Sequence, residues 1–160
     1  MRETSGVRDG SGRRFAVVAS RFHPEICDAL VAGAVGCLRE HGAAEGDVTV
    51  IRVPGAWELP LALEAAAASG SFDALVAIGA LVRGETAHFD VISAEASAGI
   101  ARVAERHRLP VGFGLLTCDT LEQAAARAGG PHGDKGREAA EAALEMADLV
   151  ARLSASAAGF

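Results

Sequence analysis

The chain has few aromatic residues: six phenylalanines, one tryptophan and no tyrosine among its 160 residues. Half of its residues are apolar all the same, and alanine and glycine supply much of that half. This composition argues against a core of bulky aromatic layers and predicts closely packed helices and strands instead. A chain of this length can form one domain with a substantial core.

Cysteine is also scarce, since Cys27, Cys37 and Cys118 form an odd and scattered set. This spacing argues against a disulfide framework and against a Cys/His metal site, and it suits a reducing cytosol. No apolar run reaches the length of a transmembrane helix, and the first residues lack the apolar stretch of a signal peptide. We therefore expect a cytoplasmic protein, not associated with a membrane, that needs no metal ion.

Basic residues are fewer than acidic ones: 15 lysines and arginines face 21 aspartates and glutamates, which gives a formal net charge of −6 at pH 7. This balance argues against a function based on general affinity for nucleic acid. The chain also lacks the glycine-rich loops G-x-G-x-x-G and G-x-x-x-x-G-K-[ST] that bind nucleotides. An anionic ligand would have to be held by a local arrangement of donors against the overall negative field.

The sequence does contain an alternation of short apolar segments with longer helical patterns. We expect four strands, over 15–19, 48–53, 74–82 and 109–117. The third is apolar on both faces, as a central parallel strand should be. Helices are expected from Pro24 to about 40, over an alanine-rich stretch ending at Gly70, and over 87–106, 119–130 and 133–153. Asp119 or Thr120 would cap the fourth helix, with glycine at its end.

This order of elements predicts an α/β fold, a three-layer α/β/α sandwich around a four-stranded parallel, flavodoxin-like sheet. We expect a single domain over residues 13–156. Residues 1–12 would be a flexible N-terminal leader and residues 157–160 a C-terminal tail.

Unusual residues follow several of the predicted strands. Because ligands of open α/β sheets bind outside the carboxyl ends of the strands, these residues are candidates for one common site. They comprise two aromatic residues, an acid, a histidine and a glycine-hydroxyl turn. They come from the segments Ser20–His23, Pro54–Glu58, Arg83–His88 and Phe113–Gly114.

The turn Gly84-Glu85-Thr86 has two interpretations. It opens a helix, so its free backbone N–H groups and the Thr86 hydroxyl could bind a phosphate, helped by the helix dipole. Alternatively, Thr86 only caps the helix, which is the commoner role for such a residue.

His88 lies in the first turn of the same helix, where the dipole disfavours the imidazolium form. A neutral ring there could accept one proton and return it elsewhere. The alternative is an ordinary surface or interface histidine, and His41, His107 and His132 fit that description.

The remaining candidates also allow a structural role. Phe22 and Trp57 could belong to the core, but in strand-exit loops a flat ring could stack on a planar heterocycle. Phe113 has a core position in its strand, although its "GFG" setting permits close approach of a ligand. Glu58 could favour a helix start or accept hydrogen bonds from ligand hydroxyls, and Arg127 and Lys135 could simply be solvated.

Five segments, in this order and spacing, resemble the lumazine synthase (6,7-dimethyl-8-ribityllumazine synthase) family over about 15–153. They are "SRFHPEI", "VPGAWELPLA", "AIGALVRGETAHFD", "PVGFGLLTCDTLEQAAARAG" and "DKGREAA". The resemblance implies a condensation of 5-amino-6-(D-ribitylamino)uracil with 3,4-dihydroxy-2-butanone 4-phosphate in riboflavin biosynthesis, which releases phosphate and water. It also implies that no cofactor is needed.

The resemblance assigns a first group of residues to the pyrimidine substrate. Phe22 would stack on its ring. Backbone groups of Ala80, Leu81 and Val82 would line the pyrimidine slot. The ribityl chain and part of the ring would be bound by Ala56, Trp57 and Glu58.

A second group would serve the other substrate and the chemistry. Glu85 and Thr86 would hold the phosphate, with Arg127 as its countercharge, and His88 would move protons. Phe113 would come from a neighbouring subunit, and Lys135 would support Arg127 or the ribityl pocket.

The resemblance further implies a homopentamer, with decamers or sixty-subunit shells in some members, and association with riboflavin synthase. The short segment from Arg127 to Lys135 favours a shell. Three residues depart from the family's common pattern, namely His23, Trp57 and Asp134. An archaeal-type riboflavin synthase on the same fold, or a non-catalytic flavin-binding or shell protein, are the alternative functions.

Overall fold

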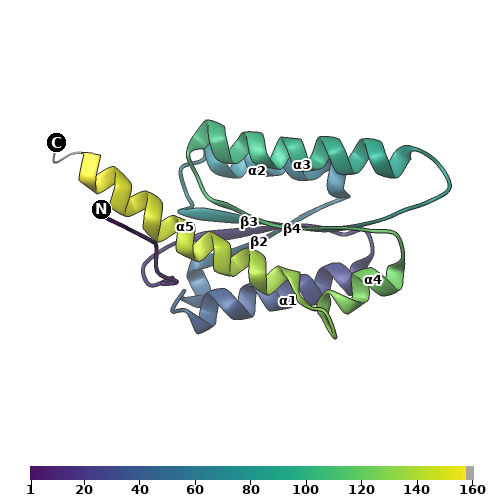
Figure 1. The fold of residues 1–160 in the computed structure, drawn as a ribbon, viewed down its shortest axis with the longest axis horizontal. Helices are drawn as coiled ribbons and strands as arrows, with labels where there is room; N and C mark the ends of the chain where they lie inside the picture. Colours follow the sequence, from purple (N-terminus) through teal and green to yellow (C-terminus); the bar gives the residue numbers. More distant parts are fainter. Residues whose placement is uncertain (158–160) are drawn as a thin grey trace.

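A four-stranded sheet forms the middle layer of the computed structural model, which describes residues 1–157 (Figure 1). Its strands lie in the order β2-β1-β3-β4, and all three neighbouring pairs are parallel. The strands span β1 Phe15–Ser20, β2 Val48–Val53, β3 Ala74–Val82 and β4 Val111–Cys118. The expected parallel sheet is thus confirmed.

Helices cover both faces of this sheet, which gives the expected three-layer sandwich. In Figure 1, α2 and α3 lie above the sheet, and α1, α4 and α5 lie below it. The helices are α1 Pro24–Glu40, α2 Leu59–Ala68, α3 His88–His107, α4 Leu121–Ala126 and α5 Lys135–Ala157. Two 3₁₀ turns, Glu45–Asp47 and Ala56–Glu58, precede β2 and α2.

The two central strands have buried residues on both faces, as their uninterrupted apolar sequence predicts. Every residue of β1 is buried, and so are the first seven of β3. Alternate side chains therefore enter two separate cores. Val76 and Ile78 pack toward α1 and α5, whereas Leu75 and Ala77 pack toward α2 and α3.

Small residues bring the lower helices close together, as the alanine- and glycine-rich composition predicts. A Cβ atom at Gly136 of α5 would collide with the backbone carbonyl of Leu30 in α1. Such close packing compensates for the scarcity of large aromatic side chains. No helix within residues 1–157 combines the length and the apolarity needed to cross a membrane.

The segment after α4 differs from its prediction. The helix expected over 119–130 ends at Ala126, and a small antiparallel hairpin follows, β5 Ala128–Gly130 and β6 Gly133–Asp134. Gly129 and Gly133 have φ of 89° and 88°, a left-handed conformation that interrupts an α-helix. The N–H of Lys135 then donates to the carbonyl of Arg127 at 2.9 Å and closes the hairpin. Thr120 is the cap of α4, because its hydroxyl accepts from Gln123 N–H.

Part of the stretch expected to be a flexible leader contacts the domain. The backbone N–H of Val7 donates to Asp148 Oδ2 at 2.9 Å, and that of Gly10 donates to the carbonyl of His41 at 2.8 Å. Asp148 also pairs with Arg13 at 3.1 Å. These bonds hold residues 7–13 against α5 and the end of α1. Of the expected C-terminal tail, residue 157 ends α5 and residues 158–160 lie outside the described part of the chain.

Candidate active site

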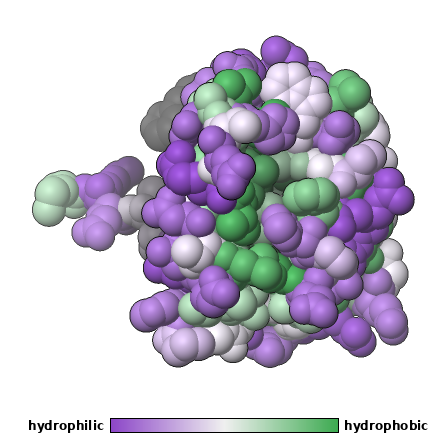
Figure 2. Space-filling view, turned by 90° about the vertical axis from the view of Figure 1, so that its right-hand side faces the viewer, coloured by the Kyte–Doolittle hydropathy of each residue, from purple (hydrophilic) through white to green (hydrophobic). Residues whose placement is uncertain are grey.

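A cleft of about 610 Å³ opens at the carboxyl ends of β1, β2 and β3. Its volume lies within the range of small-molecule sites. Figure 2 views the end of the molecule where α3 begins, and a band of apolar side chains runs through the middle of this face. The sequence-predicted site residues that line the cleft are Phe22, Ala56, Trp57, Glu58, Ala80, Leu81, Val82, Thr86 and His88.

The exit of β1 supplies Phe22, whose side chain is 62% exposed and so does not belong to the core. Its backbone is fixed from both sides, because its N–H donates to Ser20 Oγ at 3.0 Å and its carbonyl accepts from Cys27 Sγ at 3.1 Å. Burial raises the pKa of the Cys27 thiol to about 11, so this cysteine remains a protonated donor behind the cleft.

His23, the next residue, also lines the cleft and has a strained backbone. Its φ of 54° and ψ of 65° place it in the left-handed region, which residues other than glycine rarely adopt. Its ring meets that of Phe22 edge-on, with centroids 4.7 Å apart. Such strain is typical of functional sites. The next residue, Pro24, begins α1.

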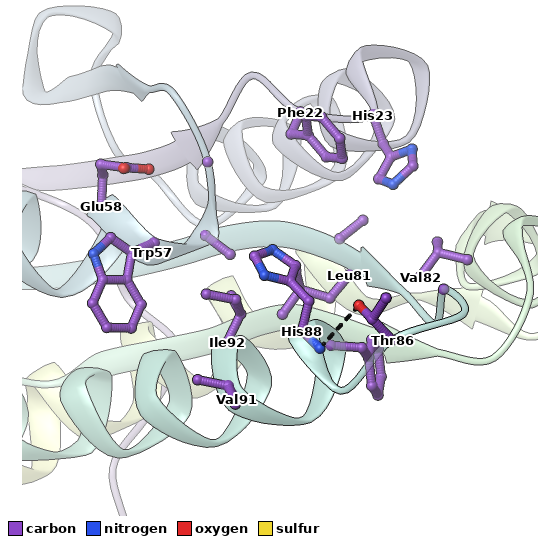
Figure 3. A pocket seen from close by; sticks show the side chains of 15 residues that line it. Phe22, His23, Trp57, Glu58, Leu81, Val82, Thr86, His88, Val91 and Ile92 are labelled. Carbon is purple, nitrogen blue, oxygen red and sulfur yellow. Dashed lines mark hydrogen bonds between the residues drawn. The ribbon is translucent and has the colours of Figure 1, made fainter.

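The exit of β2 supplies Trp57 and Glu58 from a 3₁₀ turn. Trp57 is 56% exposed, while its neighbours Ala56 and Leu59 are buried and fix the turn to the core. Figure 3 shows Trp57 and Glu58 together at one end of the cleft, with Phe22 and His23 on its opposite side. Neither aromatic side chain has the core role that the sequence left open.

The exit of β3 forms the floor of the cleft and the turn beside it. Ala80, Leu81 and Val82 line the floor, and Ala80 is only 2% exposed. Thr86 Oγ1 accepts a hydrogen bond from His88 N–H at 3.3 Å (Figure 3). The N-cap of α3 is Ala87, and within residues 1–157 no side chain caps this helix, so Thr86 is not its cap. The hydroxyl hydrogen of Thr86 remains able to donate to a ligand.

His88 is the first residue of α3, and Figure 3 shows its ring pointing into the middle of the cleft. The side chain is exposed. Within residues 1–157 no hydrogen bond is made to its ring nitrogens. A ring in this position can give a proton to a bound molecule or take one from it.

Four predicted site residues do not line the cleft of this chain. Glu85 is exposed beside it, and Phe113 is 51% exposed on the edge strand β4. Arg127 Nη1 donates to the carbonyl of Gln123 at 2.9 Å, and Lys135 Nζ pairs with Glu138 at 2.6 Å. Phe113 is therefore not the core residue that its strand position suggested.

The structure adds lining residues to which the sequence analysis gave no role. Two of them, Val91 and Ile92, lie three and four residues after His88, so helical periodicity would have placed them on the same face. The others are His23, Gly55 and Phe89, and Gly84 of the predicted phosphate-binding turn lines the cleft as well. Within residues 1–157, no group of three His, Cys, Asp or Glu side chains is arranged to hold a metal ion.

Comparison with known proteins bears on this cleft. Residues 12–151 match the family model described as 6,7-dimethyl-8-ribityllumazine synthase. A protein of that name from Aquifex aeolicus is 49% identical over 148 residues, which cover 92% of this chain and 96% of the relative. One from Desulfovibrio desulfuricans is 50% identical, with coverage of 93% and 96%. One from Gemmatimonas aurantiaca is 51% identical, with coverage of 95% and 93%.

Proposed function

The chain belongs to the 6,7-dimethyl-8-ribityllumazine synthase family, and from this premise we propose how its cleft carries out the reaction. The enzyme is a transferase of riboflavin biosynthesis that condenses 5-amino-6-(D-ribitylamino)uracil with 3,4-dihydroxy-2-butanone 4-phosphate. A single observation carries the proposal: the ring of His88 points into the cleft, which Gly84 and Thr86 of the predicted phosphate-binding turn also line.

The pyrimidine ring lies against Phe22 and over the floor of Ala80, Leu81 and Val82. The exposure of Phe22 and its fixed backbone support this placement, because a stacking ring must be both accessible and held in orientation. The ribityl chain extends toward Ala56, Trp57 and Glu58 at the other end of the cleft. There the Glu58 carboxylate can accept hydrogen bonds from its hydroxyl groups.

The phosphate of the second substrate binds at Gly84-Glu85-Thr86. The backbone N–H groups of this turn precede α3 and lack partners within the helix, and Thr86 adds a hydroxyl. This placement brings the ketone close to His88. The uracil amine then attacks the ketone, water leaves to give an imine, phosphate is eliminated, and a second imine closes the ring with loss of water.

His88 moves the protons of these steps. The amine loses protons as it forms the imine, and the leaving oxygen atoms must gain them. An imidazole can take part in both transfers near neutral pH. The substrates bring their own nucleophile and leaving group, so the protein mainly orients them and relays protons.

Phe113, Arg127 and Lys135 act in the cleft of a neighbouring subunit of a homopentamer. Their absence from the cleft of their own chain and the exposure of Phe113 support this proposal. Arg127 would then offset the phosphate charge across the interface. The compact hairpin between Arg127 and Lys135 favours closure of pentamers into a sixty-subunit shell, with which riboflavin synthase could associate. Sedimentation distinguishes the shell from a pentamer or a decamer.

The test of this function is incubation of the purified protein with both substrates while the absorbance of the lumazine is followed. We expect lumazine to form only when both substrates are present. Turnover of lumazine alone would instead indicate a riboflavin synthase. Absence of any product would indicate a non-catalytic protein.

A further inference from the structure

Arg83 lies between the floor of the cleft and the turn proposed to bind phosphate, yet it does not line the cleft. Both of its neighbours, Val82 and Gly84, do line it. The side chain is bonded elsewhere: Nε donates to Asp119 Oδ1 at 2.9 Å and Nη1 donates to Asp90 Oδ1 at 3.1 Å. The guanidinium is therefore engaged with protein groups on both of its edges.

A third contact fixes the plane of the guanidinium. Its Cζ atom lies 4.5 Å from the centroid of the Phe89 ring, and Phe89 is only 9% exposed. The backbone N–H of Arg83 donates to the carbonyl of Cys118 at 2.9 Å. Arginine suits such a position because its planar fork can bond two carboxylates while it stacks on an aromatic ring.

These partners come from both elements that flank the turn. Phe89 and Asp90 belong to the first turn of α3, whereas Cys118 ends β4 and Asp119 follows it. Arg83 thus ties the start of α3 to the end of the neighbouring strand. The three residues between the arginine and α3 that would contact phosphate are all exposed, so their orientation depends on these fixed ends.

Charge gives Arg83 a second effect on the same turn. Asp90 and Asp119 place two carboxylates beside a site that must receive a dianion. The guanidinium lies between them and neutralises part of their charge, and the same hydrogen bonds raise its own pKa above the ordinary value. Loss of Arg83 would release the turn and leave both carboxylates uncompensated.

We propose that Arg83 is a positioning residue for the phosphate-binding turn, which acts through Asp90 and Asp119 and not on the ligand. The proposal rests on the proposed function, in which Gly84-Glu85-Thr86 holds the phosphate. It distinguishes Arg83 from Arg127, which is proposed to offset the phosphate charge directly.

The first test compares Arg83→Gln with Arg83→Lys in the assembled enzyme. For Arg83→Gln we expect the KM for the butanone phosphate to rise about tenfold and the KM for the pyrimidine to change less than about twofold. Arg83→Lys keeps the charge without the fork, and an intermediate rise is expected. Arg106→Gln is the matched control, since Arg106 pairs with Glu64 at the other end of α3. It should change neither KM. The proposal would be overturned if, in each of the two Arg83 variants, the KM for the pyrimidine rose as much as the KM for the butanone phosphate.

The second test decides whether Arg83 acts through its two partners. If it does, Asp90→Ala/Asp119→Ala raises the KM for the butanone phosphate, because the loss of a fixed turn outweighs the removal of two charges that repel the dianion. Adding Arg83→Gln to that pair then has little further effect. If Arg83 contacts the phosphate itself, removal of the carboxylates frees the guanidinium. The KM then falls or stays unchanged, and Arg83→Gln retains its full effect in the combined variant. That result would overturn the proposal.

Thr86→Ala separates this inference from the proposed function. If Thr86→Ala raises the KM for the butanone phosphate and Arg83→Gln does not, only the role of Arg83 is wrong. If Thr86→Ala leaves that KM unchanged, the phosphate binds elsewhere and the proposed placement itself fails. Thermal unfolding and sedimentation of each variant verify that the compared proteins are folded and assembled.

Discussion

The two ends of α3 each carry a histidine, and the surroundings of the two rings differ. His88 begins the helix in the cleft, and within residues 1–157 its ring has no hydrogen-bond partner. His107 ends the helix, and its Nε2 lies 2.8 Å from Glu64 Oε1 in α2. Arg106 contacts the same carboxylate oxygen at 3.0 Å. The first ring is available to a ligand, whereas the second is engaged in joining α3 to α2.

The position of each histidine in the helix explains this division. Backbone N–H groups without helical partners gather at the start of a helix and favour anions there, whereas free carbonyl groups gather at its end and favour cations. Arg106 and His107 accordingly lie in the last turn of α3. Under the proposed function, the histidine at the start of α3 moves protons, whereas the histidine at its end contacts Glu64 of α2.

The largest effect is expected from His88→Ala. Loss of the proton carrier should lower kcat about a hundredfold, which is a typical contribution of one general acid–base group. Sedimentation should show that the variant remains assembled, because the ring makes no hydrogen bond to hold the fold. The measurement is the initial rate of lumazine formation with both substrates saturating.

His107→Ala is the matched control at the other end of the same helix. It should leave kcat close to that of the wild type and lower the thermal stability instead. A His88→Ala rate comparable to that of the wild type would remove this residue from the mechanism and erase the difference between the two ends.

The cleft end of α3 could largely be predicted from the sequence, because local rules determine it. The apolar β1 and β3, the strand exits and the glycine-hydroxyl turn lie in short segments whose chemistry can be recognised directly. Helical spacing from His88 would also have found Val91 and Ile92.

The other end of α3 could not be predicted, because its partner is remote in sequence. The sequence predicts only an ordinary surface or interface histidine at position 107, because nothing local indicates its contact with Glu64, which lies 43 residues earlier in the chain. The hairpin after α4 was missed because the run of alanines before Arg127 favours a helix. The left-handed glycines at 129 and 133 override that local preference.

A smaller effect is expected from His23→Asn, which tests whether the cleft contains a second proton carrier. Asparagine tolerates the left-handed backbone of residue 23 but cannot take up a proton near neutral pH and removes the edge contact to Phe22. We expect kcat to change less than about threefold and the KM for the pyrimidine to rise slightly. A loss of kcat as large as that of His88→Ala would show that the two histidines share the relay.

The smallest effect on turnover is expected from Glu64→Gln, which removes the charge that holds the far end of α3. The kcat and the KM values should remain as in the wild type, while the melting temperature at pH 7 falls by a few degrees. The hydrogen bonds from His107 and then from Arg106 lower the pKa of Glu64 below its ordinary value of 4.5. Because the pKa of Glu64 is lower in the folded state, its stabilisation is fully present above pH 4.5. It is lost as the pH falls through the pKa of the folded state.

The stability difference between the wild type and Glu64→Gln should therefore narrow as the pH falls below 4.5. A pH-independent part of this stability difference will remain. Oε2 of Glu64 is buried without a hydrogen-bond partner within residues 1–157, and in the variant an amide group takes its place. Glu105→Gln is the control, since Glu105 is exposed on α3 and makes no ion pair within those residues. Thermal unfolding followed by circular dichroism across this pH range measures the difference. A pH-independent gap would show that shape, and not the charge of Glu64, joins α3 to α2.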